Sequence, residues 1–368
     1  MKEKHMTLFI YGYYGWDNTG DDAMLYTLLE KLPLLYPSAD FVVLSRKAVR
    51  VPPMVEGKVK FIPRDLLSAV TWLLKSSVFI VGGGTHIYDY GIKKQNLRIL
   101  TQLWLLFLLA RLTGNRVYLV NNGVGPLTTK WGRFLAKSIL CMAEKISVRD
   151  RASYDTLLSL GLESRTRLGF DLSALLKTTL QTKPAKRILG ISVSPAFEIY
   201  EGNREKDSLV LDQVVKAIKY NPGWDVWLFV IKGESVLDDF SATMELQGKL
   251  KPLKVTVVPY NPDTNKFLDK VGQCSAFVGM RYHACLFAYL SNLPLLVINY
   301  HPKCNALAEE IGLAKKGVIS LSEILGGQLP RRLRCLMRYP GKFRAMLPLS
   351  EARDRADSAI RGIREVEK

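Results

Sequence analysis

Short apolar runs that alternate with helical patterns are the feature that most constrains the fold of this chain. In the first half, the apolar runs cover Leu8–Gly12, Phe41–Leu44, Val59–Ile62, Val78–Val81, Arg116–Asn121 and Lys145–Val148, and the helical patterns cover Asp22–Leu35, Leu97–Leu112, Trp131–Ala143 and Ala152–Leu160. The second half has runs at Ile188–Val193, Val226–Ile231, Val255–Val258, Ala276–Val278 and Leu295–Ile298, and helical patterns at Leu209–Lys219, Val236–Leu250, His283–Leu290, Asn305–Ile311 and Ser350–Val366. Such alternation is typical of βαβ units around a mainly parallel sheet. The sequence therefore predicts an α/β fold with doubly wound, Rossmann-like sheets.

The alternation is interrupted at residues 177–186, which are polar, contain Pro184 and lack apolar periodicity. A chain of 368 residues is also longer than one hydrophobic core usually serves. We therefore expect an N-terminal Rossmann-like domain at 1–176, a second at 187–330, and a basic C-terminal segment with a final helix at 331–368. Two such domains that face each other form a cleft, and ligands bind beyond the carboxyl ends of the strands.

Cysteine usage and hydropathy limit the class of protein. The chain has five cysteines and no CxxC pair, which argues against a disulfide framework or a zinc site and favours a reducing compartment. The first 22 residues do not resemble a signal peptide. The longest apolar run, Leu103–Ala110, is too short to span a bilayer and predicts a buried helix, with an interfacial helix as the alternative. We expect a cytoplasmic protein.

The formal net charge of +18 bears on the partners of the protein and not on its fold. Residues 331–346 carry six basic side chains and no acidic one, with Leu333, Leu336 and Phe343 among them. Such a segment favours docking on an anionic membrane surface at the inner face of the membrane, and a solvated helix face beside an anionic site is an equal alternative. No recognisable nucleic-acid motif accompanies the charge, so we expect no nucleic acid as a partner.

Two glycine-rich loops follow predicted strands of the N-terminal half. Residues 12–22 contain three glycines and several short polar side chains, of which Asp17, Asn18, Asp21 and Asp22 are candidates for binding sugar hydroxyls, although Thr19 or Asp21 also fits a helix cap. Residues 82–89 contain Gly83, Gly84 and His86, and three glycines after a buried strand indicate close approach of a ligand to the backbone. A lone histidine such as His86 is more often structural than catalytic.

Basic side chains follow three other predicted strands. Arg149 comes directly after Val148, and Asp150 fits the cap of the next helix, so the guanidinium is available for a carboxylate or phosphate. Asp171 ends the following strand and is a candidate to orient an arginine. The richest sequence, Gly279–Ala284, brings Arg281 and His283 to the start of an apolar helix, and Lys303 follows the next strand together with His301.

The candidate side chains share a positive charge, and no cluster of carboxylates or histidines suits a metal ion. The chain also lacks a P-loop lysine motif and a GxSxG nucleophile elbow. The sequence therefore predicts a cleft that binds a small anion and needs no metal and no nucleotide cofactor.

The ordered set GYYGWDNTGDDAM, GGGTHIYD, GVGP, SVRD, GFD, GMRYHACLFA and NYHPK resembles the polysaccharide pyruvyl transferase family, specifically bacterial members that act on cell-wall polymers. The resemblance implies a fold similar to GT-B glycosyltransferases, phosphoenolpyruvate as the donor substrate, and a cyclic ketal on two sugar hydroxyls with release of phosphate. It also implies roles in donor binding and catalysis for Arg149, Arg281, His283 and Lys303. The family usually has Glu at the position of Asp22 and Asp at that of His301.

From these residues we expect Arg149, Arg281 and Lys303 to hold phosphoenolpyruvate, Gly83, Gly84 and His86 to lie beside it, and His283 to act as general acid and base. The acceptor is a sugar of a cell-surface glycan precursor, with a lipid-linked form as one alternative. Two rival functions remain open: a GT-B glycosyltransferase that uses a nucleotide sugar, and a non-catalytic basic module that binds membrane or nucleic acid.

Overall fold

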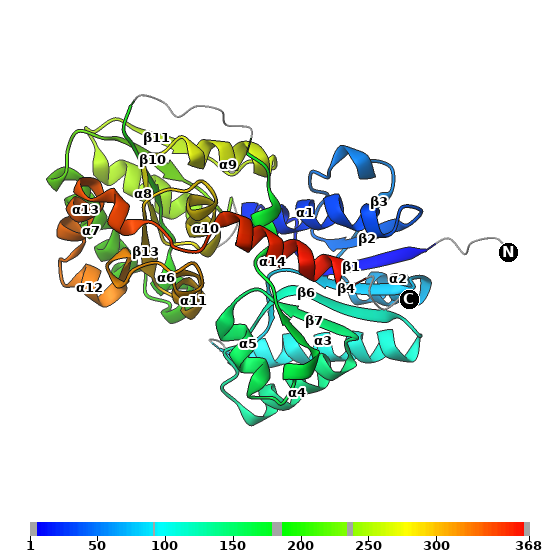
Figure 1. Ribbon diagram of the computed structural model, residues 1–368. Helices are drawn as coiled ribbons and strands as arrows, with labels where there is room; N and C mark the ends of the chain where they lie inside the picture. Colours follow the sequence, from blue (N-terminus) through cyan, green and yellow to red (C-terminus); the bar gives the residue numbers. More distant parts are fainter. Residues whose placement is uncertain (1–5, 91–92, 179–185, 234–237, 364–368) are drawn as a thin grey trace. The chain divides into compact units, whose positions relative to one another are not determined.

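The computed structural model describes residues 6–90, 93–178, 186–233 and 238–363 and divides the chain into two compact units (Figure 1). Unit 1 comprises residues 1–16, 21–176 and 350–368, and unit 2 comprises residues 17–20 and 177–349. The expected linker lies mostly outside the described residues, because 179–185 are not among them. Residues 331–368 do not form one body, since they are divided between the two units at 349 and 350.

Unit 1 contains a sheet whose strands follow the order β3-β2-β1-β4-β6-β7-β8, with β5 paired to β6. The strands are β1 (Thr7–Tyr14), β2 (Asp40–Ser45), β3 (Val59–Ile62), β4 (Val78–Gly82), β5 (Thr85–Ile87), β6 (Arg116–Val124), β7 (Lys145–Val148) and β8 (Thr166–Leu168). Neighbouring strands are parallel, and Ile10 lies between Val43 and Ile80 in register. The strand order reverses between β1 and β4, so the loops that follow these two strands line the switch point.

Helices cover both faces of this sheet (Figure 1). They are α1 (Thr19–Leu35), α2 (Leu66–Lys75), α3 (Lys93–Leu112), α4 (Lys130–Met142), α5 (Arg151–Leu158) and α14 (Leu349–Arg361), with 3-10 turns at Pro53–Val55, Glu163–Arg165 and Leu172–Leu175. One core joins the sheet to the inner sides of α2, α3, α4 and α5, through side chains such as Leu73, Phe107, Ile139 and Leu157. The parallel sheet is thus buried on the side of these helices, as its continuous apolar strands require.

The C-terminal helix α14 belongs to unit 1 although the chain reaches it last. Ala352 and Ala356 are fully buried, and the Asn121 side-chain amide donates a hydrogen bond to the Ala356 carbonyl at 3.1 Å. Lys31 of α1 forms an ion pair with Asp357 at 2.8 Å. Small residues on one side of α14 therefore let it pack closely on the face that α1 covers.

Unit 2 contains a second parallel sheet with the order β11-β10-β9-β12-β13-β14. Its strands are β9 (Ile188–Ser192), β10 (Asp225–Phe229), β11 (Val255–Val258), β12 (Ala276–Gly279), β13 (Leu295–Asn299) and β14 (Val318–Ser320). Its helices are α6 (Ala196–Glu201), α7 (Arg204–Tyr220), α8 (Asp239–Leu250), α9 (Thr264–Gly272), α10 (Tyr282–Leu290), α11 (Pro302–Glu310), α12 (Leu321–Leu325) and α13 (Leu329–Arg338), with 3-10 turns at Lys315–Gly317 and Pro340–Phe343. The order reverses between β9 and β12, which is the switch point of this sheet.

The predicted α/β fold with two parallel sheets is confirmed. The pattern missed α2, because Leu66–Lys75 is almost continuously apolar and shows little helical periodicity in the sequence. It also missed β14, because a three-residue strand leaves too few positions for a strand pattern. The strand expected to end at Asp171 is β8, which ends at Leu168, and Asp171 instead caps the 3-10 turn Leu172–Leu175. The predicted helix at 236–250 begins at Asp239, and residues 236 and 237 lie outside the described part of the chain.

The apolar run Leu103–Ala110 lies within α3, where Leu103, Leu106, Phe107 and Ala110 are buried against the sheet. Among the described helices, none has the length and uninterrupted apolar character that a bilayer crossing requires. All five cysteines are free. Two of them hold the turn after β12, because the Cys285 and Cys304 thiols donate to the carbonyls of Gly279 and Met280.

Gly190 on β9 provides a test of the packing of unit 2. A Cβ at this position would lie 2.4 Å from the ring of Phe277 and 2.9 Å from the Cys274 sulfur, so neighbouring core side chains must shift. We expect Gly190→Ala to lower the free energy of unfolding by about 1–3 kcal/mol in urea denaturation. Gly248→Ala on α8 is the matched control, because no atom lies within 4 Å of the added methyl group and alanine favours a helix. Equal stabilities of the two variants would contradict this account of the core.

Candidate functional site

The switch point of unit 2 brings together the ends of β9 and β12. Ser192 pairs in register with Gly279, and the Met280 amide donates to the Ser192 carbonyl at 3.0 Å. Arg281 and His283 follow this pairing directly, so both start within a few residues of the crevice that opens beyond neighbouring strands. The sequence prediction placed these two side chains at a strand end, and the structure puts that strand beside the switch point.

The first turn of α10 is buried, and its amide groups have no side-chain cap. Arg281 occupies the N-cap position but makes no capping hydrogen bond. Tyr282, His283 and Ala284 are all buried. Other helices of this unit differ: Asp263 caps α9 and His301 caps α11 with a side-chain acceptor. The positive end of the α10 dipole, which no side-chain cap compensates, therefore favours an anion at this point.

The Arg281 guanidinium is fixed by a buried carboxylate. Its Nε donates to Asp239 Oδ1 at 2.6 Å, and Asp239 is fully buried in the first turn of α8. Burial raises the pKa of Asp239, while the guanidinium opposes this shift. The negative charge of Asp239 and the Tyr300 hydroxyl raise the pKa of Arg281 although burial opposes them, so the side chain stays cationic. A guanidinium has five N–H donors, and these two partners leave some of them for a ligand.

The loop after β13 supplies a further basic side chain. Lys303 lies in the first turn of α11, and β13 is the neighbour of β12 in the sheet. His301 is the N-cap of this helix, because its Nδ1 accepts a hydrogen bond from the Lys303 amide at 3.2 Å. Aspartate is a preferred N-cap residue, so an aspartate at position 301 would suit the same role.

Residues 17–20 belong to unit 2, although they comprise the end of the β1–α1 loop and the first two residues of α1. The Thr19 amide donates to the Ile231 carbonyl at 3.0 Å, the Gly233 amide donates to the Asp17 carbonyl at 2.7 Å, and Asn18 forms an antiparallel bridge with Lys232. Of the predicted acceptor residues, Asp17 and Asn18 therefore lie in unit 2, and Asp21 and Asp22 lie in unit 1.

Gly20 brings this loop against the imidazole of His283. A Cβ at Gly20 would lie 1.9 Å from His283 Nδ1 and 2.0 Å from Cγ, so only glycine fits here while the imidazole keeps its place. The Asn18 side chain accepts a hydrogen bond from the Gly20 amide at 3.1 Å, which holds the turn. The structure thus brings the 17–20 loop and His283 together within one unit.

Two serines that the sequence reasoning missed complete this edge of unit 2. Ser192 is 0% exposed and Ser194 is 4% exposed. Within the described chain, neither hydroxyl has a hydrogen-bond partner. Ser192 is two residues beyond Gly190, so it lies on the face of the sheet where the ring of Phe277 packs. Buried hydroxyls without partners are costly in an apolar interior, and a bound ligand that accepts hydrogen bonds from them removes this cost.

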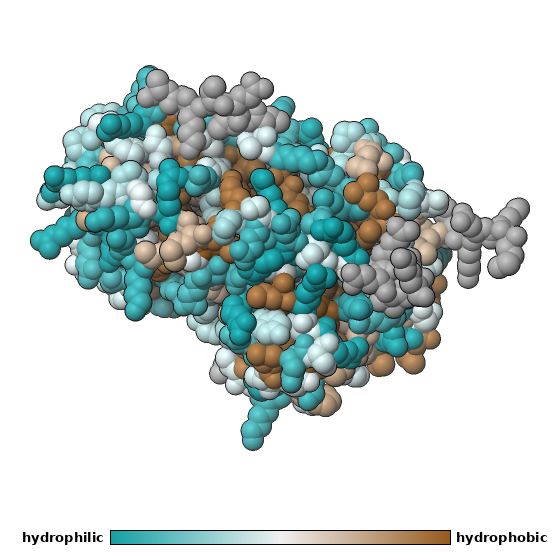
Figure 2. Space-filling model, in the orientation of Figure 1, coloured by the Kyte–Doolittle hydropathy of each residue, from teal (hydrophilic) through white to brown (hydrophobic). Residues whose placement is uncertain are grey.

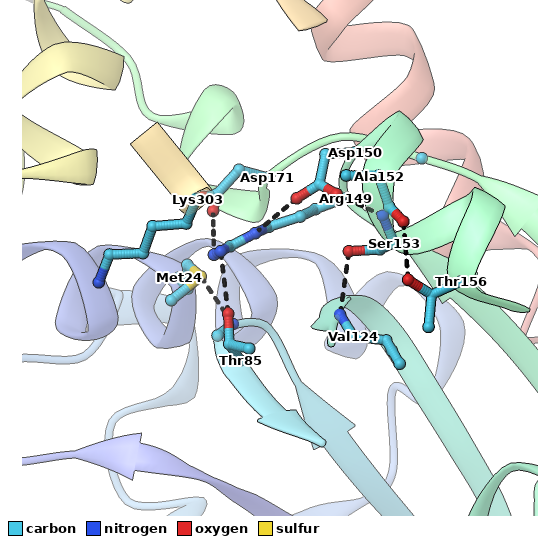
Figure 3. Close-up of polar contacts among 12 residues, drawn as sticks. Met24, Thr85, Val124, Arg149, Asp150, Ala152, Ser153, Thr156, Asp171 and Lys303 are labelled. Carbon is cyan, nitrogen blue, oxygen red and sulfur yellow. Dashed lines mark hydrogen bonds and ion pairs between the residues drawn. The ribbon is translucent and has the colours of Figure 1, made fainter. Parts of the chain in front are cut away.

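In unit 1, Arg149 lies in a network of hydrogen bonds (Figure 3). Its Nε contacts Asp150 Oδ2 at 3.2 Å, its Nη1 contacts Asp171 Oδ2 at 3.5 Å, and its Nη2 donates to Thr85 Oγ1 at 2.9 Å. Asp150 also caps α5 through the Ser153 amide. The sequence suggested that Asp150 caps the helix and leaves Arg149 without it as a partner, and this was wrong. In the structure Asp150 caps the helix and pairs with Arg149 at the same time.

Close packing explains the glycines beside this network. A Cβ at Gly123 would lie 2.5 Å from Thr85 Oγ1 and 3.1 Å from Arg149 Nη2. Gly83 and Gly84 both have positive φ values, and a Cβ at Gly83 would lie 2.6 Å from the Met24 sulfur. Gly83 is therefore required by the approach of α1, and Gly123 by the approach of the guanidinium.

His86 and the two acidic residues at the start of α1 lie at the switch point of unit 1. A Cβ at Gly84 would lie 3.0 Å from His86 Nε2 and 3.7 Å from Asp21 Oδ1. Burial, with the positive charges of Arg64 and Arg149, lowers the pKa of His86 to about 4, so its imidazole is neutral at neutral pH. Asp22 accepts a hydrogen bond from the Gly15 amide at 3.2 Å and so stabilises the turn after β1.

The sequence reasoning also missed aromatic and basic residues at the same edge of unit 1. Tyr13 and Trp16 stack with ring centroids 5.1 Å apart, and Arg46 lies 4.6 Å above the Trp16 ring. Arg64 contacts the Gly12 carbonyl and lies over the Tyr11 ring at 5.2 Å. Arg46 directly follows the β2 strand, and this position after a strand was the available signal.

Among the described residues, no group of three or more His, Cys, Asp and Glu side chains is arranged to hold a metal ion. The positive charge at the switch point of unit 2 comes from the Arg281 guanidinium and from the N-terminal end of the α10 dipole. The arrangement suits an anion that carries oxygen acceptors and offers an imidazole for proton transfer nearby.

Comparison with known structures shows the same architecture in enzymes of nucleotide-sugar chemistry. A UDP-GlcNAc 2-epimerase from Methanocaldococcus jannaschii, in complex with UDP-GlcNAc and UDP, aligns with a TM-score of 0.63 at 10% identity over 99% of each chain. The UDP-GlcNAc 2-epimerase from Neisseria meningitidis aligns with a TM-score of 0.61 at 10% identity over 100% of each chain. CalG4, the calicheamicin glycosyltransferase, aligns with a TM-score of 0.51 at 11% identity over 99% of this chain and 98% of its own. These likenesses establish a GT-B-like fold and nothing about the substrate.

A sequence search found no match among curated proteins. The family comparison gives a match that spans residues 18–302, a region that includes Arg149, Arg281 and His283. This region begins in the 17–20 loop and ends in the first turn of α11, so it covers both switch points apart from β1. The chain belongs to the polysaccharide pyruvyl transferase family, which is a family of enzymes.

Proposed function

We propose that this enzyme transfers pyruvate from phosphoenolpyruvate to two hydroxyls of a sugar in a cell-surface glycan precursor, with formation of a cyclic ketal and release of phosphate. The observation that carries the proposal is the meeting of Arg281, the uncapped N-terminus of α10 and His283 at the switch point of unit 2. Membership of the pyruvyl transferase family supports a pyruvate donor and a sugar acceptor.

Phosphoenolpyruvate carries a carboxylate and a phosphate, and the proposed donor site has a group for each. The phosphate binds at the α10 N-terminus beside Arg281, where the positive end of the helix dipole and a fixed guanidinium stabilise negative charge. Lys303 binds the second anionic group from the first turn of α11. The Ser192 and Ser194 hydroxyls donate to the phosphate oxygens, which gives these buried groups partners.

In the proposed reaction, the two hydroxyl protons of the acceptor balance the products. The terminal carbon of the enol takes one proton and becomes a methyl group, and the first sugar hydroxyl forms a bond to the central carbon. The bond from this carbon to the phosphate oxygen breaks, and the second hydroxyl closes the ring while the other proton leaves with phosphate. His283 acts as the general acid and base for these transfers, because it lies two residues after Arg281 in the sequence and against the 17–20 loop.

Arg149 is proposed as a further donor contact from unit 1, with Gly83, Gly84 and His86 beside it. Asp150 and Asp171 hold the guanidinium in one orientation, which lowers the entropic cost of its binding to an anion. His86 is neutral at neutral pH, so we assign it to hydrogen bonding and not to charge stabilisation.

The acceptor sugar is proposed to approach the 17–20 loop. Asp17 and Asn18 lie on this loop, and Gly20 brings it into contact with His283, where a hydroxyl must be deprotonated. Asp21 at the start of α1 is a further acceptor contact in the proposal. Asp22 contributes through the turn that it stabilises, because its carboxylate bonds the Gly15 amide.

The proposed function is tested by incubating the enzyme with phosphoenolpyruvate and a panel of sugar acceptors. We expect a product whose mass exceeds that of the acceptor by pyruvate minus water, together with an equal amount of phosphate. A parallel incubation uses an isotope-labelled UDP-sugar as donor. Transfer of the labelled sugar without transfer of pyruvate would instead make the enzyme a nucleotide-sugar glycosyltransferase.

A second experiment addresses His283 by removal and by displacement. His283→Ala is expected to abolish phosphate release from phosphoenolpyruvate while the circular dichroism spectrum is kept. Gly20→Ala is expected to lower kcat at least about tenfold, because the added methyl group displaces an imidazole that is needed for proton transfer. Gly341→Ala is the control, at a glycine whose φ is not positive and that has no atom within 4 Å of an added Cβ. Near-normal phosphate release by His283→Ala would refute the assignment.

A third experiment addresses the two buried serines through binding and not turnover. We expect Ser192→Ala and Ser194→Ala each to weaken binding of inorganic phosphate about 5- to 20-fold in calorimetric titration, because each loses one hydrogen bond to a charged group. Ser275→Ala is the matched control: its hydroxyl accepts from the Ile188 amide at the opposite, amino end of the same two strands. Equal phosphate affinity in all three variants would remove the serines from the donor site.

A further inference from the structure

Three neighbouring helices of unit 1 expose apolar side chains on the side that faces away from the sheet. α2 packs against α3, and α3 packs against α4, while the inner sides of all three are buried in the core. The exposed apolar residues are Leu66, Leu67 and Leu74 on α2, Ile99, Leu105 and Leu112 on α3, and Trp131 and Phe134 on α4. We refer to these eight residues as the α2–α4 surface.

The spacing of these residues places them along one side of each helix. Leu67 and Leu74 are seven residues apart, as are Leu105 and Leu112, and Trp131 and Phe134 are three apart. Leu67 is 78% exposed and Leu112 is 76% exposed, so they stand well clear of the core. Figure 2 shows hydrophobic side chains among hydrophilic ones in the part of unit 1 where Figure 1 places these helices. Contiguous exposed apolar surface on a folded protein indicates an interaction site.

The charge of the same helices is of one sign. The sequences of α2, α3 and α4 contain no aspartate or glutamate. Their described basic side chains are Lys75, Arg98, Arg111, Lys130, Arg133 and Lys137, and all except Arg133 are on exposed residues. The acidic residues nearest in sequence are the α2 cap Asp65, the fully buried Asp89, and Glu144, which pairs with Arg111 at 3.4 Å.

We propose that the α2–α4 surface docks the enzyme on an anionic membrane. Apolar side chains that are flanked by basic ones suit an interface where lipid tails take up the former and anionic headgroups attract the latter. Trp131 and Phe134 stack with centroids 5.1 Å apart, and aromatic rings are favoured at the headgroup level. A second copy of the chain is a poorer partner, because it would bring like charges together.

Part of the α2–α4 surface lies at the carboxyl edge of the sheet of unit 1. In βαβ units the helices run opposite to the strands, so their first turns lie at the carboxyl edge of the sheet. Leu66 and Leu67 lie in the first turn of α2, and Trp131 lies in the first turn of α4. Leu74 and Leu112, in the last turns of α2 and α3, lie at the opposite edge, and the surface extends from there to the edge that carries Thr85 and Arg149. If the proposed function holds, a lipid-linked acceptor reaches this edge without leaving the bilayer, whereas docking itself does not depend on that function.

The basic segment 331–346 exposes two large apolar side chains, Tyr339 and Met346, against eight on the α2–α4 surface. Leu333, Leu336 and Phe343 are buried in the core of unit 2, so they are not available to lipid. The exposed residues Arg331, Arg334 and Arg338 provide attraction alone. This segment therefore matches a solvated helix face, and the α2–α4 surface is the better membrane contact.

The proposal is tested with the full chain and vesicles in a flotation assay without substrate. Vesicles of phosphatidylglycerol and phosphatidylcholine are expected to carry the enzyme, and vesicles of phosphatidylcholine alone are not. The double variant Trp131→Ala, Phe134→Ala is expected to lower the fraction bound to anionic vesicles at least about tenfold. Because both side chains are 56% exposed, the fold should persist, and circular dichroism checks this.

Matched variants distinguish vesicle binding through the α2–α4 surface from non-specific hydrophobic binding and from binding through basic residues elsewhere on the chain. Leu209→Ala, Tyr220→Ala removes two side chains of α7 that are each 52% exposed, and we expect wild-type vesicle binding from it. Arg331→Glu, Arg334→Glu, Arg338→Glu is expected to weaken binding less than the α4 double variant. The proposal is overturned if the wild type does not bind anionic vesicles, if the α4 variant binds as the wild type does, or if only the arginine variant loses binding. An enzyme that binds vesicles but does not use phosphoenolpyruvate would leave the docking intact and reject the proposed function.

Discussion

A parallel sheet that is connected by helices places the N-termini of those helices at one edge, and this constraint governs both units. Every helix begins with amide groups that lack a partner within the helix. In most cases a side chain accepts from them: Asp65 in α2, Thr129 in α4, Asp150 in α5, Asp238 in α8, Asp263 in α9 and His301 in α11. At α10 the cap position holds Arg281, which can donate but not accept. The arginine thus adds to the positive potential at the start of α10, whereas side-chain acceptors compensate this potential at the neighbouring helices α9 and α11.

The fold and part of the candidate site could be predicted from the sequence for physical reasons. Buried parallel strands are continuous apolar runs, so β4, β9, β12 and β13 were predictable, and residues just after them were candidates because ligands bind at that edge. Arg281 and His283 were found by this argument. Ser192 and Ser194 were not, because a serine after a strand is common and only burial without a partner distinguishes these two.

Other parts of the site depend on contacts that no local pattern encodes. Asp238 and Asp239 both fit a helix start, and only the structure shows that the first caps α8 while the second pairs with Arg281. The membership of residues 17–20 in unit 2 rests on a bridge between Asn18 and Lys232, which are far apart in the sequence. The exposed apolar side of α3 was equally hidden, because the unbroken apolar run Leu103–Ala110 does not reveal which side of the helix faces the core.

The assignment of α14 to unit 1 has a consequence for how the chain is completed during synthesis. The helix α14 packs beside Asn121, whose side-chain amide bonds the Ala356 carbonyl. The buried side of α14 carries Ala352 and Ala356, which become buried only when the helix packs on unit 1. During translation the sheet of unit 1 is synthesised first. The helix α14 can pack on unit 1 only after residues 177–349 of unit 2 have been synthesised. The unit that is translated earlier is therefore completed later, and removal of α14 would damage the packing of unit 1.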